Sequence, residues 1–542
     1  IRGVLLPFSV VVLSIIWTMG SMGWLGLAVT VVSSALPALM VAVASSYGIH
    51  FMLQYYEQVK KGNNSPLSAK LALHNIAPAI ALTGATSALG ALTLLVFKVT
   101  SIQEFGAATA IGVLSATLLS LSFIPAILAL QKTTSGKSFP KLDQSIDQAL
   151  FSASRFSVKH KYMVSITSLI FLSLFSWYGL SQLKYGQDFI EYFEEGHRLR
   201  IAFDQFNSEL GGARYMDVMV EAPKQGGLQN PTYLKQMEAF QTYAESLPFV
   251  GHTQSFVDII TRINSAMNEN KLSHEVIPDT EETIAQYQLL YSMSGTPGEQ
   301  NNLIDYDNQR AKIRIMLTTS EQDDHKWLYQ TLKEASKNTF SPELNIEFGG
   351  DIMFWLAQIQ YIVEGKILNI LASILVVLVF CTFIFRTLSA GLLSIIPLTI
   401  ATLLTLSMMG VLGIRLDVGT AIVTAIGVGI GVDFTIHFLK RLIKEYQIQP
   451  NIEIASGITA TTAGKAIVYD TLSNVAGFSV FILSGFQPLQ FFGWLISLMM
   501  ITSALATIVI FPATIAILGK KLLQKSSNTG VDMDSTYSTS NT

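Results

Sequence analysis

The sequence predicts a polytopic α-helical membrane protein that carries one α/β domain outside the membrane. The 542 residues are 50% hydrophobic and 13% charged, and their mean hydropathy of +0.44 is too high for a soluble protein of this length. Ten apolar runs are each long enough to cross a bilayer, and a polar stretch of roughly 180 residues separates the fifth run from the sixth. These observations indicate a bundle of membrane helices with one large loop domain.

The overall charge and the single cysteine exclude several classes of function. The chain has 35 Lys and Arg against 38 Asp and Glu, a formal net charge of −3, so no basic surface indicates nucleic-acid binding. Cys381 lies in an apolar run, which leaves neither a disulfide framework nor a metal-thiolate site. The sequence contains no nucleophile-base constellation and no phosphate-binding loop, so we expect a protein that is not an enzyme and carries no cofactor.

The apolar runs and the segments between them divide the chain into six parts. The runs cover about 3–27, 29–53, 78–98, 103–131, 161–181, 366–385, 389–413, 417–440, 465–485 and 490–518. We expect a first membrane bundle (1–131), an amphipathic cytoplasmic linker (132–160), one membrane helix (161–181), a soluble domain (182–365), a second membrane bundle (366–518) and a disordered cytoplasmic tail (519–542).

Positively charged residues predict the orientation. Lys and Arg are frequent in the loops and ends on one side of the membrane, including Lys440 and Arg441, whereas the short loops on the other side contain Lys98 and Arg415. Because cytoplasmic loops carry an excess of Lys and Arg, this asymmetry places the C-terminus in the cytoplasm. We therefore expect a multi-pass protein of the cell inner membrane with its soluble domain in the periplasm.

An internal repeat is the next signal. Residues 46–51 (SYGIHF) overlay residues 433–438 (DFTIHF) at a shift of 387, and the same shift carries Gly90 onto Gly477. The two copies should share one topology and be related by an axis along the membrane normal. Because the second copy begins with a membrane helix and a soluble domain that the first copy lacks, we expect roughly 230 further residues ahead of this sequence.

The soluble domain has the pattern of an α/β fold. Alternating strands and periodic helices follow one another as β-α-β and again β-α-β, which is the order of a ferredoxin-like unit. The stretch between the two halves, 269–309, is expected to be rich in loops. The expected strands are 214–222, 249–256, 310–317 and 344–350, and the expected helices are 231–247 and 325–338.

One apolar run contains an ionisable carboxylate, Asp433. An Asp at the centre of a membrane helix costs roughly 2.5 to 3.5 kcal/mol, so a retained one usually faces a bundle interior and handles ions or protons. Gly427, Gly429 and Gly431 precede it and are expected to give the helix a bare face for close packing. His437 follows one turn later on the same side as Asp433.

Further polar side chains are expected at the depth of Asp433. Asp470 and Asn474 bracket that depth when their helix is measured from its cytoplasmic end at ~1.5 Å per residue. If the helices adjoin, these two residues, His437 and Tyr47 form a polar cluster with Asp433. We expect the cluster to couple proton movement to transport.

The residues described above resemble the resistance-nodulation-division (RND) superfamily. The resemblance rests on the two membrane repeats, on the external α/β domain and on Gly429-x-x-x-Asp433 in the fourth helix of the second repeat. Within the superfamily, YGIHF (47–51), VDFTIHF (432–438) and LIDYDNQRAKIRIML (303–317) are similar to the MMPL branch of exporters, which is related to hopanoid and mycolipid transporters and to Patched-like proteins.

The resemblance implies twelve helices and two porter domains, of which this chain would supply helices three to twelve and the second porter domain. It also implies a proton-driven exporter whose partners are membrane lipids, protons and a hydrophobic or lipidic substrate. In mycobacterial relatives each central helix carries an Asp-Tyr pair, and each Asp meets the Tyr of the other copy. The matching positions here are Ser46-Tyr47 and Asp433-Phe434, which leaves the cross-pair Asp433 with Tyr47 and indicates a single titrating carboxylate.

Two other functions stay open at this point. One is a proton-driven assistant of protein export, similar to Sec-associated membrane proteins of the same superfamily. The other is a sterol- or lipid-sensing receptor, because the helices around Ser46 correspond to the sensing bundle of Patched-like relatives. Retained function after neutralisation of Asp433 would favour the receptor. The sequence leaves the substrate open, and also whether the protein acts as a homo-oligomer or with a periplasmic partner.

Overall fold

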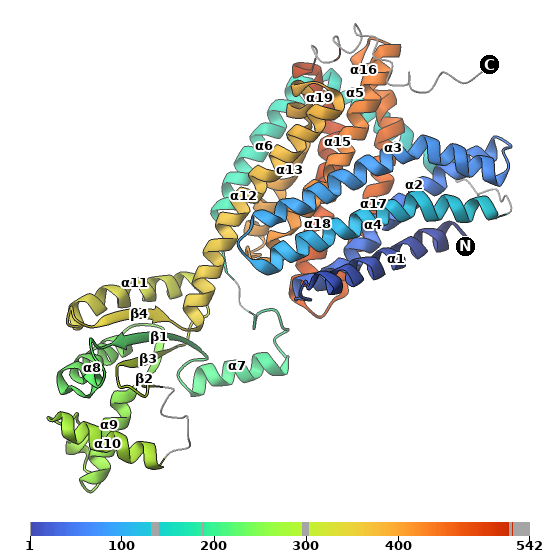
Figure 1. Cartoon of the computed structure of the whole chain (residues 1–542). Coiled ribbons are helices and arrows are strands. Elements are labelled where there is room, and N and C mark those ends of the chain that lie inside the picture. Colours follow the sequence, from blue (N-terminus) through green and yellow to red (C-terminus); the bar gives the residue numbers. More distant parts are fainter. Residues whose placement is uncertain (1, 132–139, 187–188, 295–302, 520–522, 524–542) are drawn as a thin grey trace. The chain divides into compact units, whose positions relative to one another are not determined.

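The computed structural model of the protein describes residues 2–131, 140–186, 189–294, 303–519 and 523 (Figure 1). They form two compact units. The first comprises the residues before Gly186 and after Gln360, and the second is Gly186–Gln360. The sequence analysis placed the corresponding limits at 182 and 365. Most of the expected tail and residues 132–139 of the expected linker lie outside the described residues.

The first unit is helical, and the described part of the chain contains ten spans that are long and apolar enough to cross a membrane. The protein is thus a polytopic helical membrane protein. Its helices are α1 (Arg2–Leu25), α2 (Leu36–Lys60), α3 (Ser65–Leu92), α4 (Thr100–Leu130), α5 (Pro140–Lys159), α6 (Lys161–Ser181), α12 (Asp351–Phe385), α13 (Leu388–Val411), α14 (Val418–Ala421), α15 (Val423–Ile448), α16 (Ile452–Thr459), α17 (Lys465–Ser479), α18 (Gln487–Leu505) and α19 (Phe511–Leu518).

The helices of this unit recur at the shift of 387 residues found in the sequence. The shift relates α1 to α13, α2 to α15, α3 to α16 and α17, and α4 to α18 and α19. The short 3₁₀ turns Thr93–Val96 and Val480–Leu483 are also separated by this shift. Gln103 and Gln490 each donate a side-chain hydrogen bond of 2.6 Å to the backbone carbonyl oxygen six residues earlier. The repetition therefore extends from the sequence to individual hydrogen bonds.

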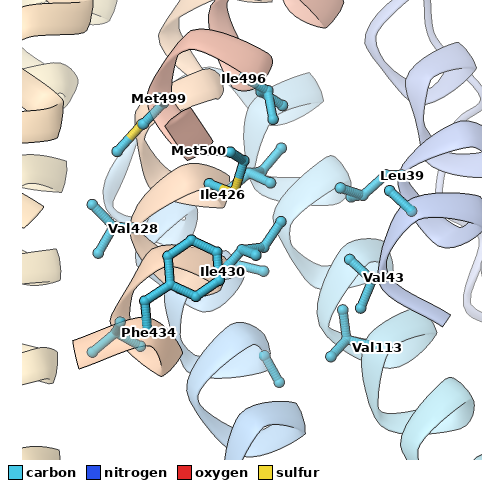
Figure 2. Packing of buried hydrophobic residues seen from close by; sticks show 14 of the residues in the cluster. Leu39, Val43, Val113, Ile426, Val428, Ile430, Phe434, Ile496, Met499 and Met500 are labelled. Atoms are coloured by element: carbon cyan, nitrogen blue, oxygen red, sulfur yellow. The ribbon is translucent and has the colours of Figure 1, made fainter. Parts of the chain in front are cut away.

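The core of the first unit surrounds α15. The span that contains α15 is 94% buried over its apolar window, against 22% for the span formed by α12. Ile430 and Phe434 of α15 lie in one apolar cluster with Leu39 and Val43 of α2 and Met500 of α18 (Figure 2). A polar side chain on α15 is therefore held away from lipid by protein on all sides.

The two most extensive contacts between the repeats are that of α3 with α15 and that of α2 with α17. At the first contact, a Cβ atom added to Gly90 would lie 2.5 Å from Gly429 Cα, so the two backbones touch. At the related contact, a Cβ atom on Gly477 would lie 3.4 Å from the Cβ of Ala42, an ordinary van der Waals distance. The α3–α15 contact is thus the closer of the two, and it requires glycine.

The second unit contains one four-stranded antiparallel sheet with strand order β2-β3-β1-β4. The predicted strands and helices are confirmed, with ends shifted by up to three residues. The stretch 269–309, which was expected to be rich in loops, also contains a helix, α10. The elements are α7 (Arg198–Glu209), β1 (Arg214–Glu221), α8 (Pro231–Glu245), β2 (Val250–Gln254), α9 (Phe256–Met267), α10 (Glu281–Ser294), β3 (Arg310–Leu317), α11 (Gln322–Thr339) and β4 (Asn345–Gly349).

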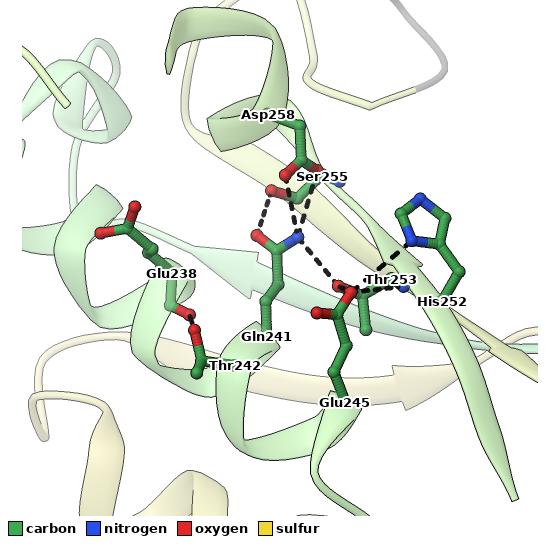
Figure 3. A network of polar contacts seen from close by, with 8 residues as sticks. All are labelled: Glu238, Gln241, Thr242, Glu245, His252, Thr253, Ser255 and Asp258. Carbon is green, nitrogen blue, oxygen red and sulfur yellow. Dashed lines mark hydrogen bonds and ion pairs between the residues drawn. The ribbon is translucent and has the colours of Figure 1, made fainter. Parts of the chain in front are cut away.

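A buried amide ties α8 to β2 and α9 in this unit (Figure 3). The Nε2 atom of Gln241 donates to Thr253 Oγ1 and to Asp258 Oδ2, both at 3.1 Å. Its Oε1 atom accepts from Ser255 Oγ at 2.6 Å. Both ends of the amide are therefore satisfied inside the domain.

Candidate functional site

Asp433 lies near the middle of α15 with 6% of its surface exposed. Its Oδ1 atom accepts a hydrogen bond from Thr86 Oγ1 of α3 at 2.7 Å. Its Oδ2 atom is buried and has no hydrogen-bond partner among the described residues. A buried carboxylate with one unsatisfied oxygen is costly in its charged form, so its surroundings favour a bound proton or water at that oxygen.

The three glycines before Asp433 lie on two faces of α15, so the expected single bare face is wrong. Atoms added as Cβ at Gly427 and Gly431 would meet α18: the first would clash with Met499 Sδ, and the second would lie 2.8 Å from Ser503 Oγ. At Gly429 the added atom would meet α3 instead. The physical reason is the helical period, because residues two apart lie on opposite sides of a helix.

Asp470 is the second carboxylate of the site, on α17. Its Oδ1 atom accepts a hydrogen bond from Ser46 Oγ of α2, and His50 Nε2 lies 3.9 Å from the same oxygen. Its Oδ2 atom accepts from Asn474 Nδ2 at 3.3 Å. Asp470 therefore joins the second repeat to the first at the α2–α17 contact, as Asp433 does at the α3–α15 contact.

The repeat relates the α2–α17 contact to the α3–α15 contact, but the helix that carries the acid in one contact corresponds to the helix that carries the hydroxyl group in the other. At a shift of 387, Ser46 corresponds to Asp433, and Thr83 corresponds to Asp470. One contact between repeats thus pairs a serine of α2 with an acid of α17, and the other places an acid of α15 opposite a threonine-bearing face of α3. Each contact keeps one carboxylate, although the two carboxylates occupy positions that the repeat does not relate.

All five residues predicted for proton coupling line one cavity of about 580 Å³. The cavity lies between α2, α3, α15 and α17, and the hydroxyl of Tyr47 is buried in it without a partner in the part of the chain that the structure describes. No hydrogen bond therefore joins Tyr47 to Asp433. Toward the C-terminal end of α15 the wall becomes cationic, with Lys440, Arg441 and Lys444.

Sequence reasoning missed three partners of the carboxylates: Thr86, and Ser46 and His50 as neighbours of Asp470. A signal for Thr86 exists, since hydroxyl residues recur at helical spacing along one face of α3. The signal for Ser46 was the repeat itself, in which Ser46 occupies the position that corresponds to Asp433. Among the described residues no group of three or more His, Cys, Asp and Glu side chains is arranged to hold a metal ion.

The arrangement can bind and release protons within a bundle whose two repeats meet at the carboxylates. Protonation turns a carboxylate from an acceptor alone into a donor and acceptor, which changes the hydrogen bonds that it can make with the opposite repeat. The cavity gives water a place beside both acids.

Comparisons with known proteins show which proteins this chain is similar to. A membrane protein of Methanocaldococcus jannaschii is 26% identical over 128 residues, which is 24% of this chain and 33% of that protein. MmpL12 of Mycobacterium tuberculosis, whose name describes a transport protein, is 27% identical over 130 residues, which is 23% of this chain and 11% of that protein. The aligned segments thus cover a third or less of these relatives.

Two solved structures share the fold at low sequence identity. The hedgehog release protein Disp of the water bear Hypsibius dujardini has a TM-score of 0.66 at 15% identity, over 96% of this chain and 67% of that one. SecDF has a TM-score of 0.54 at 12% identity, over 97% of this chain and 59% of that one. The model of the MMPL family matches residues 2–160 and 197–532. Because that match covers most of the chain, the chain is a member of the MMPL family, in the RND superfamily.

Proposed function

We propose that this chain is part of a proton-driven exporter of lipidic or other hydrophobic molecules, and that Asp433 binds the coupling proton. The observation that supports this most is the unsatisfied Oδ2 atom of Asp433, buried beside a cavity between two membrane repeats. A carboxylate that only held helices together would be expected to have both oxygens satisfied.

The energy for transport comes from the membrane potential and the proton gradient. One proton that crosses the whole membrane releases roughly 2.3 kcal/mol per 100 mV. When Asp433 is charged, burial favours contact with donors such as Thr86; when it is neutral, that preference weakens. Because Thr86 belongs to the other repeat, the proton changes the free energy of the contact between the repeats. The repeats then shift relative to each other, as in other transporters built from repeats.

The soluble unit acts in this proposal as a porter domain on the periplasmic side. Its β-α-β-β-α-β order with strand order β2-β3-β1-β4 supports a ferredoxin-like fold. The helix α12 begins at Asp351 in this unit and continues to Phe385 in the membrane unit, so one continuous helix connects them. The name of MmpL12 supports transport as the activity.

The test is export of a fluorescent phospholipid from proteoliposomes under an imposed proton gradient. We expect the variant Asp433→Asn to export at the background rate, because an amide of nearly the same shape cannot take up and release a proton. The matched control is Glu57→Gln on the exposed side of α2, where Glu57 pairs with Lys61 at 2.9 Å, and it should export normally. Proton-dependent export by Asp433→Asn would contradict the proposal and favour a lipid-sensing receptor.

A further inference from the structure

One ionisable group is buried in the membrane unit away from the residues that line the cavity. Lys366 of α12 has 4% of its surface exposed. Its Nζ atom donates to the carbonyl oxygen of Ala421 at 2.7 Å and to Thr424 Oγ1. Both acceptors are neutral and lie where α14 gives way to α15. A protonated amine in this place is desolvated without an opposite charge to compensate, which costs several kcal/mol.

The charged groups near Lys366 in the fold are engaged elsewhere. Glu364, two residues earlier on α12, faces Lys98 at 3.5 Å. Asp417, which begins α14, accepts from the backbone nitrogen of Thr420 at 2.7 Å. Within the described residues no acidic side chain forms an ion pair with Lys366. The unfavourable charge can therefore be removed by loss of the proton, a change that lysine undergoes readily when it is buried.

A line of polar side chains begins one turn further along α12. Asn369 Nδ2 donates to Thr93 Oγ1 at 2.9 Å, and Thr93 Oγ1 lies 3.1 Å from Ser373 Oγ. Thr93 directly follows α3, the helix that carries Thr86, the partner of Asp433. The amide and hydroxyl groups thus follow one face of α3 from the level of Lys366 toward Asp433.

Both ends of this line have unused hydrogen-bonding capacity. The Oδ1 atom of Asn369 is buried and lacks a partner in the described part of the chain, as does the Oδ2 atom of Asp433. Each of these acceptors can bind a water molecule, and water is the carrier that a proton needs between side chains that do not touch.

The middle of the line is closed in this structure. Gly90 and Gly429 lie there, with their backbones so close that an added Cβ atom at Gly90 would be 2.5 Å from Gly429 Cα. An atom placed between the two backbones would clash, so no water molecule fits there. A connection from Lys366 to Asp433 therefore requires α3 and α15 to separate at these glycines.

Lys366 and the cavity approach Asp433 from opposite ends of α15. Asp433 lies about 14 Å from Thr424 and about 10 Å from Lys440, at ~1.5 Å per residue. The cavity reaches Asp433 from the Lys440 end, whereas Lys366 lies at the Thr424 end. Asp433 is thus approached by a cavity on one side and by the line of polar side chains on the other.

We propose that Lys366 is a second proton-binding group of the exporter and forms the outer end of a proton route to Asp433. This inference rests on the proposed proton coupling at Asp433. A proton from the outer side binds the lone pair of neutral Lys366 Nζ. When the glycine contact opens, Lys366 returns to the neutral amine, and water and the hydroxyls of α3 carry the proton to the carboxylate of Asp433. The proton then leaves through the cavity.

The experiment measures lipid export and lumenal pH together in proteoliposomes that contain a fluorescent phospholipid and a trapped pH dye. In Lys366→Gln the side chain keeps N–H donors, but it cannot bind a proton. We expect it to lower both proton uptake and lipid export by about tenfold or more. In Lys366→Arg the donors and the charge remain while release of the proton is prevented, and the same loss is expected. Thermal unfolding of each variant shows whether the fold is intact.

The matched control is Lys98→Gln, which removes an exposed lysine that pairs with Glu364. It should transport as the unchanged protein does. Lys366→Gln or Lys366→Arg with at least half of the normal export would overturn the inference, and so would an equal loss in Lys98→Gln. Proton-driven export in Asp433→Asn, or none in the unchanged protein, would instead contradict the proposed function on which the inference rests.

Discussion

Gln241 in the soluble unit and Asp433 in the membrane unit are equally buried, each with 6% of its surface exposed, yet their hydrogen bonds differ. Both ends of the Gln241 amide are paired, and its partners belong to the elements that it joins. Asp433 has one paired oxygen and one oxygen without a partner in the described chain. The hydrogen bonds of Gln241 fix the position of its amide, whereas the free oxygen of Asp433 can still bind a proton or a water molecule.

The difference supports the proposal that Asp433 has a functional role, whereas the Gln241 network is structural. A satisfied network in a low-dielectric interior holds its elements in one arrangement. An unsatisfied carboxylate beside a cavity costs stability, and such a cost is typical of residues that are retained for function. Variants at the two residues should therefore separate stability from transport.

The largest effect on stability is expected from Gln241→Met. This change leaves Asp258, Thr253 and Ser255 without their buried partner, so the free energy of unfolding should fall by about 2–4 kcal/mol. Unfolding in urea, followed by fluorescence, measures it. The control is Thr242→Val, which removes an exposed hydroxyl that bonds only the carbonyl oxygen of Glu238 within its own helix at 2.9 Å, and should change stability by less than about 0.5 kcal/mol (Figure 3).

Asp433→Asn completes this comparison, because its unfolding free energy should be unchanged or higher while its export is lost. A buried amide costs less to desolvate than a buried carboxylate. If Asp433→Asn were as destabilising as Gln241→Met, the acid would be a structural group like the amide, and the contrast between the two units would disappear.

The two related glycines, Gly90 and Gly477, test whether the closer contact between repeats matters. Gly90→Ala forces a Cβ atom to 2.5 Å from Gly429 Cα, and this overpacking should cost about 1–3 kcal/mol and lower export. Gly477→Ala meets Ala42 at 3.4 Å and should cost less than about 1 kcal/mol. Thermal unfolding and lipid export of both variants measure the difference. Equal effects would mean that the α3–α15 contact has no special role.

Several elements were predictable from the sequence because their signal is local. The strands β1 and β3 alternate in polarity, and Asp433 is conspicuous because an acid in an apolar run is rare. The start of α12 was not predictable in this way. Hydropathy marks the apolar run from residue 366, whereas the helix begins at Asp351, because polar residues such as Gln358 and Gln360 end an apolar run without ending a helix.

The hydrogen-bond partners between different membrane helices could not be predicted from the sequence. Tyr47 was expected to bond Asp433, but in the structure Thr86 is the hydrogen-bond partner of Asp433. The partner depends on which helices lie next to each other, and the sequence does not show this. Lys366 gave no signal, since a lysine at the edge of an apolar run is usually solvated. Its burial depends on the packing of α12 against α15, which hydropathy does not report.

Exchange of the acid between the hydrogen-bonded residues Ser46 and Asp470 is expected to have a smaller effect than loss of Asp433. Asp470→Ser should lower export by about tenfold, since one contact between repeats then lacks a carboxylate. The double variant Ser46→Asp with Asp470→Ser returns an acid to the α2–α17 contact, next to Tyr47, and should recover a substantial part of the export. Lipid export from proteoliposomes measures both variants. A double variant no better than Asp470→Ser would show that the position of this acid matters and not only its presence.

The smallest effect is expected at a charged group of the soluble unit that is fully paired. Glu221 of β1 accepts from Arg310 Nε at 2.7 Å and from Asn345 Nδ2 at 3.2 Å, and these hydrogen bonds lower the pKa of its carboxyl below the ordinary value of 4.5. A lowered pKa in the folded state stabilises the fold above the ordinary value, and this stabilisation is lost as the pH falls through the folded-state pKa.

Glu221→Gln should therefore be slightly less stable than the unchanged protein at neutral pH. The difference should begin to shrink as the pH falls below about 4.5, the ordinary value for this carboxyl, and should vanish below the lower folded-state pKa. The effect is small because the pair is exposed to solvent. Urea unfolding at a series of pH values measures it, and lipid export should not change. Lost export in Glu221→Gln would mean that a satisfied surface pair also takes part in transport, so that complete pairing would no longer distinguish structural polar groups from functional ones.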